Sequence, residues 1–381
     1  MIGSSRREAM KSLVFLTGAA AAQLAARSTQ STYAYVGCFT TAERQGHGDG
    51  IHLFRMDPQT GAWAHIQHVG SLTNPSFLIL SRDQRFLYSV HGDENYVSSF
   101  AIDSKTKYLT PLNRVSAGGS NGVHLATDAS GKFLLIANYS TGTVGTFRLQ
   151  SDGKIEDRVQ LTELPAPAGL NARTSSHPHQ IVFDPSGRFV LVPDKGLDRV
   201  FVFQFDSISG KLTLADPGSM GAPHLSTPRH LGFHPSLPII WVLNESASTV
   251  TSCQWDSERG SLQPFQTLRT LPPDFTGHST AAEIAVLSNG RFIYSSNRGH
   301  DSVSIFSSDP NTGALKTIGL VPTEGMGPRF ISLDPSQRFL YAANEVGGSV
   351  VTYRVDHETG HLTPTGQKVS TPSPVCIAFF T

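Results

Sequence analysis

One short turn motif recurs along this chain at roughly fifty-residue intervals, and it constrains the fold more than any other feature. The motif is an Asp, a few polar residues, a Gly, one further residue and a large apolar residue. Complete copies begin at Asp57, Asp206, Asp256, Asp309 and Asp356. Two weaker copies occupy residues 103–109, where Lys107 replaces the Gly, and residues 151–155. Each copy predicts a hairpin turn, because Asp can bond to its local backbone and Gly adopts positive φ. Seven turns predict seven repeated units.

A second repeat has the same period and shows where each unit begins. In it an apolar strand is followed by Asp-Pro-Ser-Gly-Arg-Phe, or a related sequence, and then by another apolar strand. Six copies are centred on Phe86, Phe133, Phe189, Ile239, Phe292 and Phe339. The seventh is split, because the chain ends on one apolar strand, residues 374–380, whose following strand is found at residues 33–39. We therefore predict an all-β, seven-bladed β-propeller in which the N- and C-terminal strands close the same blade and leave no sheet edge exposed.

The composition fits this prediction and narrows the classes of partner. The chain has 381 residues with 35 Gly and 23 Pro, as expected of an all-β protein with many turns. Because blades share one continuous core, residues 28–381 are expected to form a single domain despite their length. With 16% charged residues and a net charge of zero, nothing indicates a nucleic-acid partner. The sequence carries no signature of an oligomeric state.

Residues 1–27 differ from the rest of the chain. Arg6, Arg7 and Lys11 precede a short apolar stretch and an Ala-rich segment, which is the pattern of an export signal. The adjacent arginines resemble the twin-arginine signal, whose cargo is exported already folded. We expect a periplasmic or secreted protein, delivered by the twin-arginine machinery and without a membrane anchor once the signal is removed. The alternative is a disordered basic tail on a cytoplasmic protein.

Cysteine spacing predicts neither a disulfide framework nor a metal site. Cys38, Cys253 and Cys376 are an odd number for an exported protein. Cys38 and Cys376 fall on adjacent strands of the closing blade, where we expect buried thiols, with a bridge between them as the alternative. No Cys-x-x-Cys pair occurs, and the sequence indicates no zinc site and no cofactor.

The repeat geometry predicts where chemistry is located. In a propeller, the start of each blade's first strand and the end of its second strand meet at one face of the disc. His, Arg, Glu and Asn are concentrated at these positions. The residues that recur in equivalent places are Asn138, Asp194, Asn297 and Asn344. Because they repeat, we expect them to tie neighbouring blades together through backbone hydrogen bonds.

A second group at the same face is specific to one or two blades, and a structural repeat does not need it. Its members are His179, Arg229, Glu245, Glu283, Arg298 and Arg329. His179 can exchange a proton near neutral pH. Arg229 and Arg298 offer planar donors suited to a carboxylate, a phosphate or an oxyanion. Glu245 would act as a base or orient one of these groups. We therefore predict a functional site here.

Several of these residues lie in blocks that resemble those of the propeller-type lactonases. This family includes bacterial 6-phosphogluconolactonase and the fungal enzyme that lactonises 3-carboxy-cis,cis-muconate. The blocks are His177-Pro178-His179-Gln180, Pro228-Arg229-His230, Asn244-Glu245, Ala282-Glu283-Ile284, Asn297-Arg298-Gly299-His300-Asp301-Ser302 and Gly327-Pro328-Arg329-Phe330. The resemblance covers residues 33–380. The chain departs from the family pattern at residues 195–197, Glu345 and Cys38, which bears on substrate choice more than on fold.

The resemblance implies a lactonase with a metal-independent site at the channel mouth. It implies a catalytic group composed of His179, Arg229, Glu245 and Arg298. The further substrate contacts that we expect are His230, Glu283, His300 and Arg329. Whether His179 or Glu245 is the base stays open at this point.

The leading hypothesis is hydrolysis of a sugar-acid lactone, most like that of 6-phosphogluconolactonase, by general acid–base catalysis with arginine anion binding. Because phosphogluconate metabolism is cytoplasmic, an exported protein also suggests an unphosphorylated lactone or a muconate-type lactonising cycloisomerase. A non-enzymatic propeller that binds a ligand at its channel mouth is a third hypothesis, because fold does not decide function.

Overall fold

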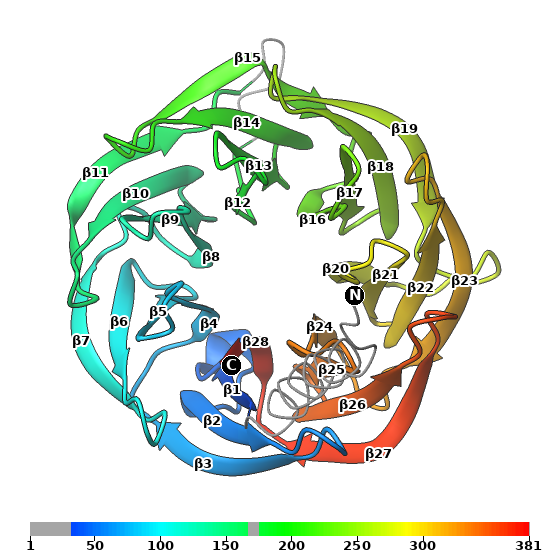
Figure 1. The fold of residues 1–381 in the computed structure, drawn as a ribbon, viewed down its shortest axis with the longest axis horizontal. Coiled ribbons are helices and arrows are strands. Elements are labelled where there is room, and N and C mark those ends of the chain that lie inside the picture. Colours follow the sequence, from blue (N-terminus) through cyan, green and yellow to red (C-terminus); the bar gives the residue numbers. More distant parts are fainter. Residues whose placement is uncertain (1–31, 167–174, 381) are drawn as a thin grey trace, which may run out of the picture.

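Seven four-stranded antiparallel sheets are arranged radially about a central axis (Figure 1). The structure, a computed structural model, describes residues 32–166 and 175–380. The predicted seven-bladed β-propeller is therefore confirmed. The predicted export signal, residues 1–27, lies outside the described residues. Within the described part of the chain, no helix is long and apolar enough to cross a membrane.

Six blades consist of four consecutive strands each. The innermost strands are β4 (Pro75–Leu80), β8 (Gly122–Thr127), β12 (Val182–Phe183), β16 (Pro228–Phe233), β20 (Thr280–Val286) and β24 (Pro328–Leu333). The second strands are β5 (Phe86–His91), β9 (Phe133–Asn138), β13 (Phe189–Asp194), β17 (Ile239–Asn244), β21 (Phe292–Arg298) and β25 (Phe339–Asn344). The third strands are β6 (Tyr96–Ile102), β10 (Thr143–Leu149), β14 (Arg199–Phe205), β18 (Thr249–Asp256), β22 (Ser302–Ser308) and β26 (Ser349–Val355). The outermost strands are β7 (Leu109–Ser116), β11 (Ile155–Glu163), β15 (Leu212–Gly221), β19 (Ser261–Arg269), β23 (Leu315–Pro322) and β27 (Leu362–Ser370).

The seventh blade joins the two ends of the chain, as the split repeat predicts. Its strands, from the inside outwards, are β28 (Pro374–Phe380), β1 (Thr32–Cys38), β2 (Ile51–Met56) and β3 (Trp63–Val69). β1 pairs with β28 from Tyr33 opposite Phe380 to Cys38 opposite Pro374. All three cysteines are buried free thiols, so the bridge considered between Cys38 and Cys376 is not formed. A short 3-10 helix, η1 (Ala42–Arg44), lies in the loop between β1 and β2.

The two sequence repeats are the two sides of one contact between neighbouring blades. The turn motif joins the outer two strands of each blade, and in the first copy Asp57 Oδ1 accepts hydrogen bonds from the backbone of Gln59 and Thr60. A Cβ on the turn glycine Gly210 would lie 2.4 Å from Phe133 Cε1 of the preceding blade. The same contact recurs in the pairs Gly61–Phe339, Gly153–Phe86, Gly260–Phe189, Gly313–Ile239 and Gly360–Phe292. Each turn therefore rests on the start of a neighbouring second strand.

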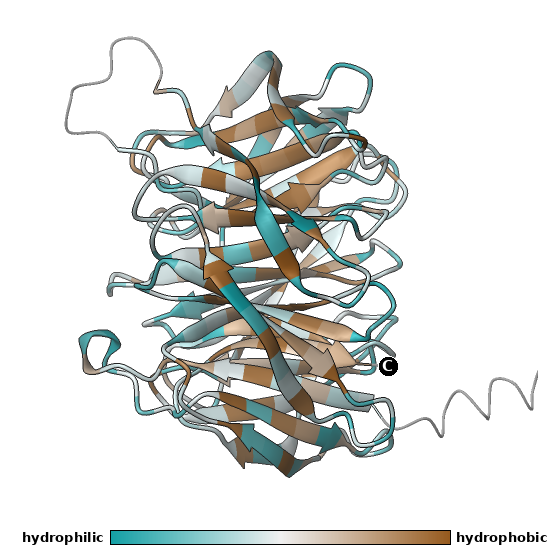
Figure 2. Ribbon diagram, turned by 90° about the vertical axis from the view of Figure 1, so that its left-hand side faces the viewer, coloured by the Kyte–Doolittle hydropathy of each residue, from teal (hydrophilic) through white to brown (hydrophobic). Residues whose placement is uncertain are grey.

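The hydrophobic core lies between the faces of adjacent blades. One cluster, for example, packs Phe133 and Leu135 of β9 against Val190 and Val192 of β13, with all four side chains fully buried. In Figure 2 hydrophobic and hydrophilic residues alternate along the strands, as expected where one face of a strand packs against its neighbour. The continuous inter-blade core explains why the chain forms one disc.

Polar ties between blades follow the prediction at three of four positions. The Asn138 amide donates to the backbone of Ala117, Asn297 to that of Thr270 and Asn344 to that of Thr323. Asp194 differs from the prediction. Its carboxylate accepts from Ser176 and from the backbone of His177, which belong to the segment entering its own blade. It thereby fixes the segment that delivers His179.

Candidate active site

The innermost strands begin with irregularities that turn side chains toward the channel mouth. In β16, Pro228 pairs with Asn244 and His230 pairs with Leu243, so Arg229 has no residue opposite it. Such a β-bulge re-aims a side chain. Equivalent shifts occur in β4, β8 and β24. The residues left unpaired there are Ser76, Val123 and Arg329. All of them line one pocket together with Arg229.

This pocket is strongly cationic. Its volume is about 260 Å³. Its lining consists of Phe39, Arg44, Ser76, Asn121, Val123, Tyr139, His179, Lys195, Arg229, Glu245, Arg298 and Arg329. In the part of the chain that the structure describes, five basic side chains and one carboxylate therefore line this pocket. Such a lining suits an anionic ligand.

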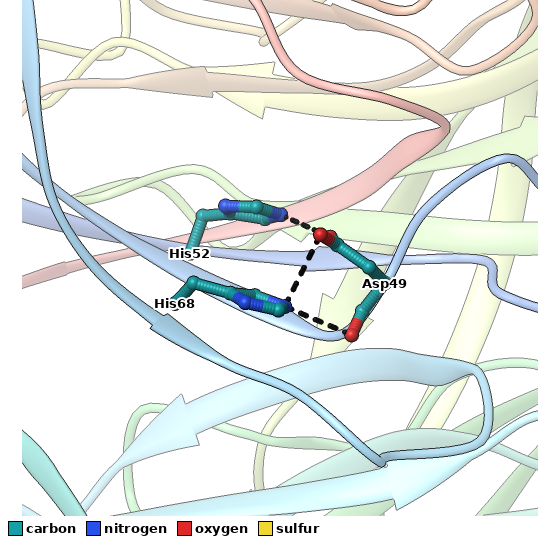
Figure 3. Close-up of side chains that lie close together, drawn as sticks. All are labelled: Asp49, His52 and His68. Atoms are coloured by element: carbon teal, nitrogen blue, oxygen red, sulfur yellow. Dashed lines mark hydrogen bonds and ion pairs between the residues drawn. The ribbon is translucent and has the colours of Figure 1, made fainter.

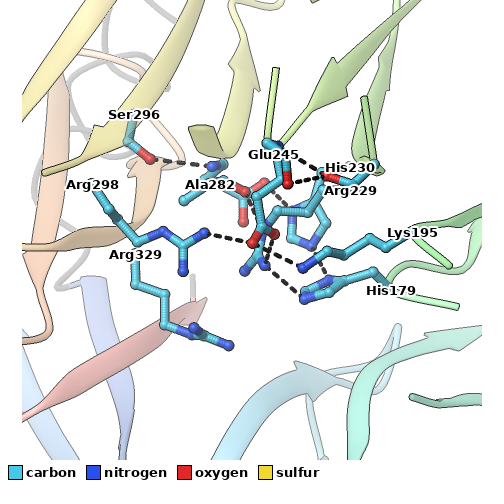
Figure 4. A network of polar contacts seen from close by, with 12 residues as sticks. His179, Lys195, Arg229, His230, Glu245, Ala282, Ser296, Arg298 and Arg329 are labelled. Carbon is cyan, nitrogen blue, oxygen red and sulfur yellow. Dashed lines mark hydrogen bonds and ion pairs between the residues drawn. The ribbon is translucent and has the colours of Figure 1, made fainter. Parts of the chain in front are cut away.

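Glu245, which directly follows β17, is the centre of an ion-pair network (Figure 4). Its Oε2 accepts a hydrogen bond of 2.6 Å from Arg229 Nη1. Its Oε1 lies 2.8 Å from Lys195 Nζ and 3.1 Å from Arg298 Nη2. Burial alone would raise the pKa of Glu245, but the three cations hold that pKa well below its usual value. Glu245 is therefore ionised at neutral pH, with both oxygens engaged.

A directional chain of hydrogen bonds runs from Arg229 away from the pocket. Arg229 Nη1 lies 2.7 Å from His179 Nε2, and a guanidinium can only donate, so Nε2 carries a lone pair. The His179 proton is thus on Nδ1, which lies 3.2 Å from His230 Nε2. His230 Nδ1 in turn donates to Glu283 Oε1 at 2.7 Å. Both imidazoles are neutral, since burial lowers the pKa of each; Arg229 and His230 lower that of His179 further.

Backbone contacts hold both ends of this chain. Arg229 Nε donates to the carbonyl of Ala282 at 2.7 Å. Glu283 Oε1 also accepts from the backbone of Ile284 at 3.0 Å, and the Glu283 backbone donates to Ser296 Oγ. These contacts fix the direction in which the Arg229 guanidinium points.

Arg298 is held differently from Arg229. Its Nε and Nη2 are buried and have no hydrogen-bond partner among the described residues, although Nη2 makes the ion pair with Glu245. The link from Nη2 to Glu245 is therefore mainly electrostatic, because the two atoms are close but poorly aligned for a hydrogen bond. Both atoms are almost completely buried, so the unpaired donors are a cost that the ion pair with Glu245 offsets.

One wall of the pocket comes from the loop between β1 and β2. Two guanidinium groups lie over the Phe39 ring, that of Arg44 at 5.2 Å and that of Arg329 at 5.0 Å from its centre. Arg44 donates to Asp93 Oδ2 at 2.6 Å, and Arg329 Nη1 lies 3.6 Å from Glu345 Oε2. Burial lowers the pKa of Arg329 to about 10, so it stays charged at neutral pH.

Comparison with known proteins decides the family. The family model described as "Lactonase, 7-bladed beta-propeller" matches residues 33–379. The chain belongs to this lactonase family. The 6-phosphogluconolactonase of Bacillus subtilis (strain 168) is 32% identical over 347 residues, covering 91% of this chain and 97% of the relative.

Two solved structures extend this lactonase comparison. The periplasmic gluconolactonase of Pseudomonas aeruginosa superposes with a TM-score of 0.85 at 27% identity, covering 92% of this chain and 99% of that one. A putative 6-phosphogluconolactonase from Bacteroides fragilis superposes with a TM-score of 0.84 at 27% identity, covering 93% and 99% of the two chains. The resemblance drawn from the sequence blocks is thereby confirmed.

The lactonase fold brings most of the predicted site residues together. His179, Arg229, Glu245, Arg298 and Arg329 all line the pocket. His230 and Glu283 do not line it. They stand behind His179 in the hydrogen-bond chain, so in this structure they can act on a ligand only through His179.

His300, which we expected to contact the substrate, lies apart from the pocket. Its Nδ1 lies 2.8 Å from Ser302 Oγ in its own turn, and its ring packs edge-on against Phe275. It is absent from the pocket lining, so its expected substrate contact has no support in this geometry. Conversely, sequence reasoning did not assign a role to Lys195, Arg44 or Phe39. A signal existed only for Lys195, at a second-strand end where the chain departs from the family pattern.

Proposed function

We propose that this protein hydrolyses an anionic sugar-acid lactone in the pocket around Glu245. The charge of the pocket carries the proposal, since five basic side chains meet one ionised carboxylate. Relatives named 6-phosphogluconolactonase and gluconolactonase, alignable over about nine-tenths of the chain, support it. A phosphorylated lactone suits the number of cations best.

Arg229 links substrate binding to catalysis. Lactone hydrolysis requires a base for water, donors for the developing oxyanion and an acid for the leaving ring oxygen. Arg229 Nη1 donates both to Glu245 and to His179, so it covers both candidate bases. A lactone carbonyl that accepts the hydrogen bond from Arg229 Nη1 would free Glu245 and His179 at the step in which water is deprotonated. Arg229 and Arg298 then stabilise the oxyanion.

His179 is the proton acceptor in this proposal, and Glu245 orients the cations and the water. Nε2 of His179 carries the lone pair, and protonation there creates an imidazolium whose Nδ1–H points to His230. The Glu283 carboxylate at the end of the chain stabilises this positive charge through His230. His179 then returns the proton to the leaving ring oxygen.

A serine nucleophile has weaker support. Residues 118–122 have Gly-x-Ser-x-Gly spacing, but they lead into strand β8, whereas a nucleophile elbow leads into a helix. Ser120 does not line the pocket.

A second candidate substrate is an unphosphorylated gluconolactone outside the cytoplasm. Residues 1–27 have the pattern of a twin-arginine export signal, and the Pseudomonas aeruginosa neighbour is described as periplasmic. In this proposal the twin-arginine machinery exports the folded propeller, residues 28–381, to the periplasm or beyond. The five basic side chains would then bind the hydroxyl groups and the carboxylate product.

A pH-stat assay of the purified chain with 6-phosphoglucono-δ-lactone and glucono-δ-lactone, with chelator present, tests the proposal. Preference for the phosphorylated lactone supports the leading proposal, and preference for the other supports the second candidate. Turnover of neither above the spontaneous rate would contradict lactone hydrolysis and favour a muconate-type cyclisation or a binding role.

A further inference from the structure

A second cluster of ionisable side chains lies in the closing blade, built from residues that do not line the catalytic pocket. Among the described residues, Asp49, His52 and His68 form a group whose potential ligand atoms all lie within 4.8 Å of one another (Figure 3). His52 Nε2 lies 2.7 Å from Asp49 Oδ1, and His68 Nε2 lies 3.3 Å from Asp49 Oδ2. His68 Nε2 is also 3.0 Å from the Asp49 carbonyl.

The backbone, rather than chance side-chain rotation, brings these groups together. His52 of β2 and His68 of β3 are directly opposite in the antiparallel register. Their rings stack with centres 5.0 Å apart and an interplanar angle of 21°. Gly50, with φ of 145°, lets the chain before β2 turn against β3, because a Cβ there would lie 2.0 Å from the Val69 carbonyl. This close approach places Asp49 beside both imidazoles.

The spacing of the donor atoms fits a small tetrahedral ion. Zinc bonds of about 2.0–2.2 Å to His and Asp place neighbouring ligand atoms about 3.4 Å apart. The N···O separations of 2.7 and 3.3 Å involve different oxygens of the Asp49 carboxylate, and one ligand atom from each of the three residues lies within 4.8 Å of the others. A small rotation of the carboxylate and of the rings would therefore bring the three atoms to this spacing. Two imidazoles and a carboxylate are also a ligand set that zinc and similar ions accept.

A third histidine supplies the hydrogen bond that the non-coordinating nitrogen of a metal-bound imidazole usually makes. The register shift between Leu53 and Phe54 skips Ile66, so His65 lies on the same face as His68. His65 Nε2 is 3.1 Å from His52 Nδ1. With His52 Nε2 on a metal, its Nδ1–H would donate to His65, which fixes the ring orientation.

We propose that Asp49, His52 and His68 bind one divalent transition-metal ion of the zinc type, with water completing a four-coordinate shell. The ion would join the end of the β1–β2 loop to β3. The same loop carries Phe39 and Arg44 into the pocket, so the ion would also restrain one pocket wall. The proposal is independent of lactone hydrolysis, because none of its ligands lines the pocket.

Titration calorimetry of the chelator-stripped, tag-free full chain with zinc chloride tests this site. The wild type should bind one ion per chain with micromolar or tighter affinity. Asp49→Asn and His68→Asn should each weaken binding at least about tenfold. Both replaced side chains are partly exposed, at 54% and 38%, so these variants should fold.

His224→Asn is the matched control. His224 is a surface histidine that lies 3.6 Å from Asp198, and its loss should leave zinc affinity unchanged. Zinc should raise the thermal unfolding midpoint of the wild type and of this control, but not that of the two ligand variants. Absence of wild-type binding, or wild-type affinity in either ligand variant, would overturn the proposal.

Discussion

At the scale of single residues, the Arg229 guanidinium controls whether the two candidate bases are free to accept a proton. One guanidinium contacts Glu245, His179 and the Ala282 carbonyl, so its position controls both candidate bases. The sequence predicted these residue types at one face because they interrupt a structural repeat. It could not predict that His230 and Glu283 lie behind His179, because the position of a residue along a strand does not show how far its side chain lies from the pocket.

Lys195 gives a pH-dependent prediction. Burial lowers its pKa to about 8, although Glu245 opposes this effect. Lys195 is charged below that pH and neutral above it, so the pocket loses a cation as the pH rises. The KM for an anionic lactone should therefore increase above pH 8, by up to about tenfold, which corresponds to roughly 1.4 kcal/mol.

Steady-state kinetics between pH 7 and 9, corrected for spontaneous hydrolysis, measure this effect. In Lys195→Arg the guanidinium stays protonated throughout, and the increase in KM should disappear. A wild-type KM that is constant across this range would contradict a role for Lys195 in anion binding.

At the scale of elements, the contact between a turn glycine and the neighbouring blade carries stability. Gly210 has φ of 77° and faces the buried Phe133 ring. Gly210→Ala should destabilise the protein by about 1–3 kcal/mol more than a glycine replacement without this contact, because the new methyl group overlaps the ring.

Gly366→Ala is the matched control, since Gly366 has the same φ of 77° and no described residue has an atom within 4 Å of its added Cβ. Urea unfolding midpoints of the two variants measure the difference. Equal midpoints would show that backbone strain alone is responsible and that the turns do not lock the blades.

The elements also show why part of the site was beyond sequence reasoning. Both repeats were visible because they recur along the chain. The β-bulges could not be seen in the sequence, because a bulge depends on the pairing register of two strands, as at Arg229. The same limit applies to His52 and His68, which are neighbours only through the β2–β3 register. Arg44 comes from a loop that has no counterpart in the repeat.

At the scale of the whole molecule, ring closure depends on β28. This strand contributes Val375, Cys376 and Ile377 to the core. Deleting residues 374–381 would expose the edge of β1 and lower the free energy of unfolding by roughly 5 kcal/mol or more, given about 1.5–3 kcal/mol for each buried apolar side chain. Circular dichroism in urea measures the loss, with deletion of Thr381 alone as the control. An unchanged midpoint would mean that closure is not needed for stability.

The most direct test of the account is the rate of lactone hydrolysis by Glu245→Gln. The substitution keeps the side-chain shape but removes the one carboxylate that the described residues contribute to the pocket lining. We predict a loss in kcat of about 100-fold or more with native circular dichroism, because a neutral amide no longer orients the cations and the attacking water. Glu258→Gln, at an exposed Glu paired with Arg188, should keep the wild-type rate. If Glu245→Gln retains most of the wild-type kcat, lactone hydrolysis does not take place in this pocket as proposed.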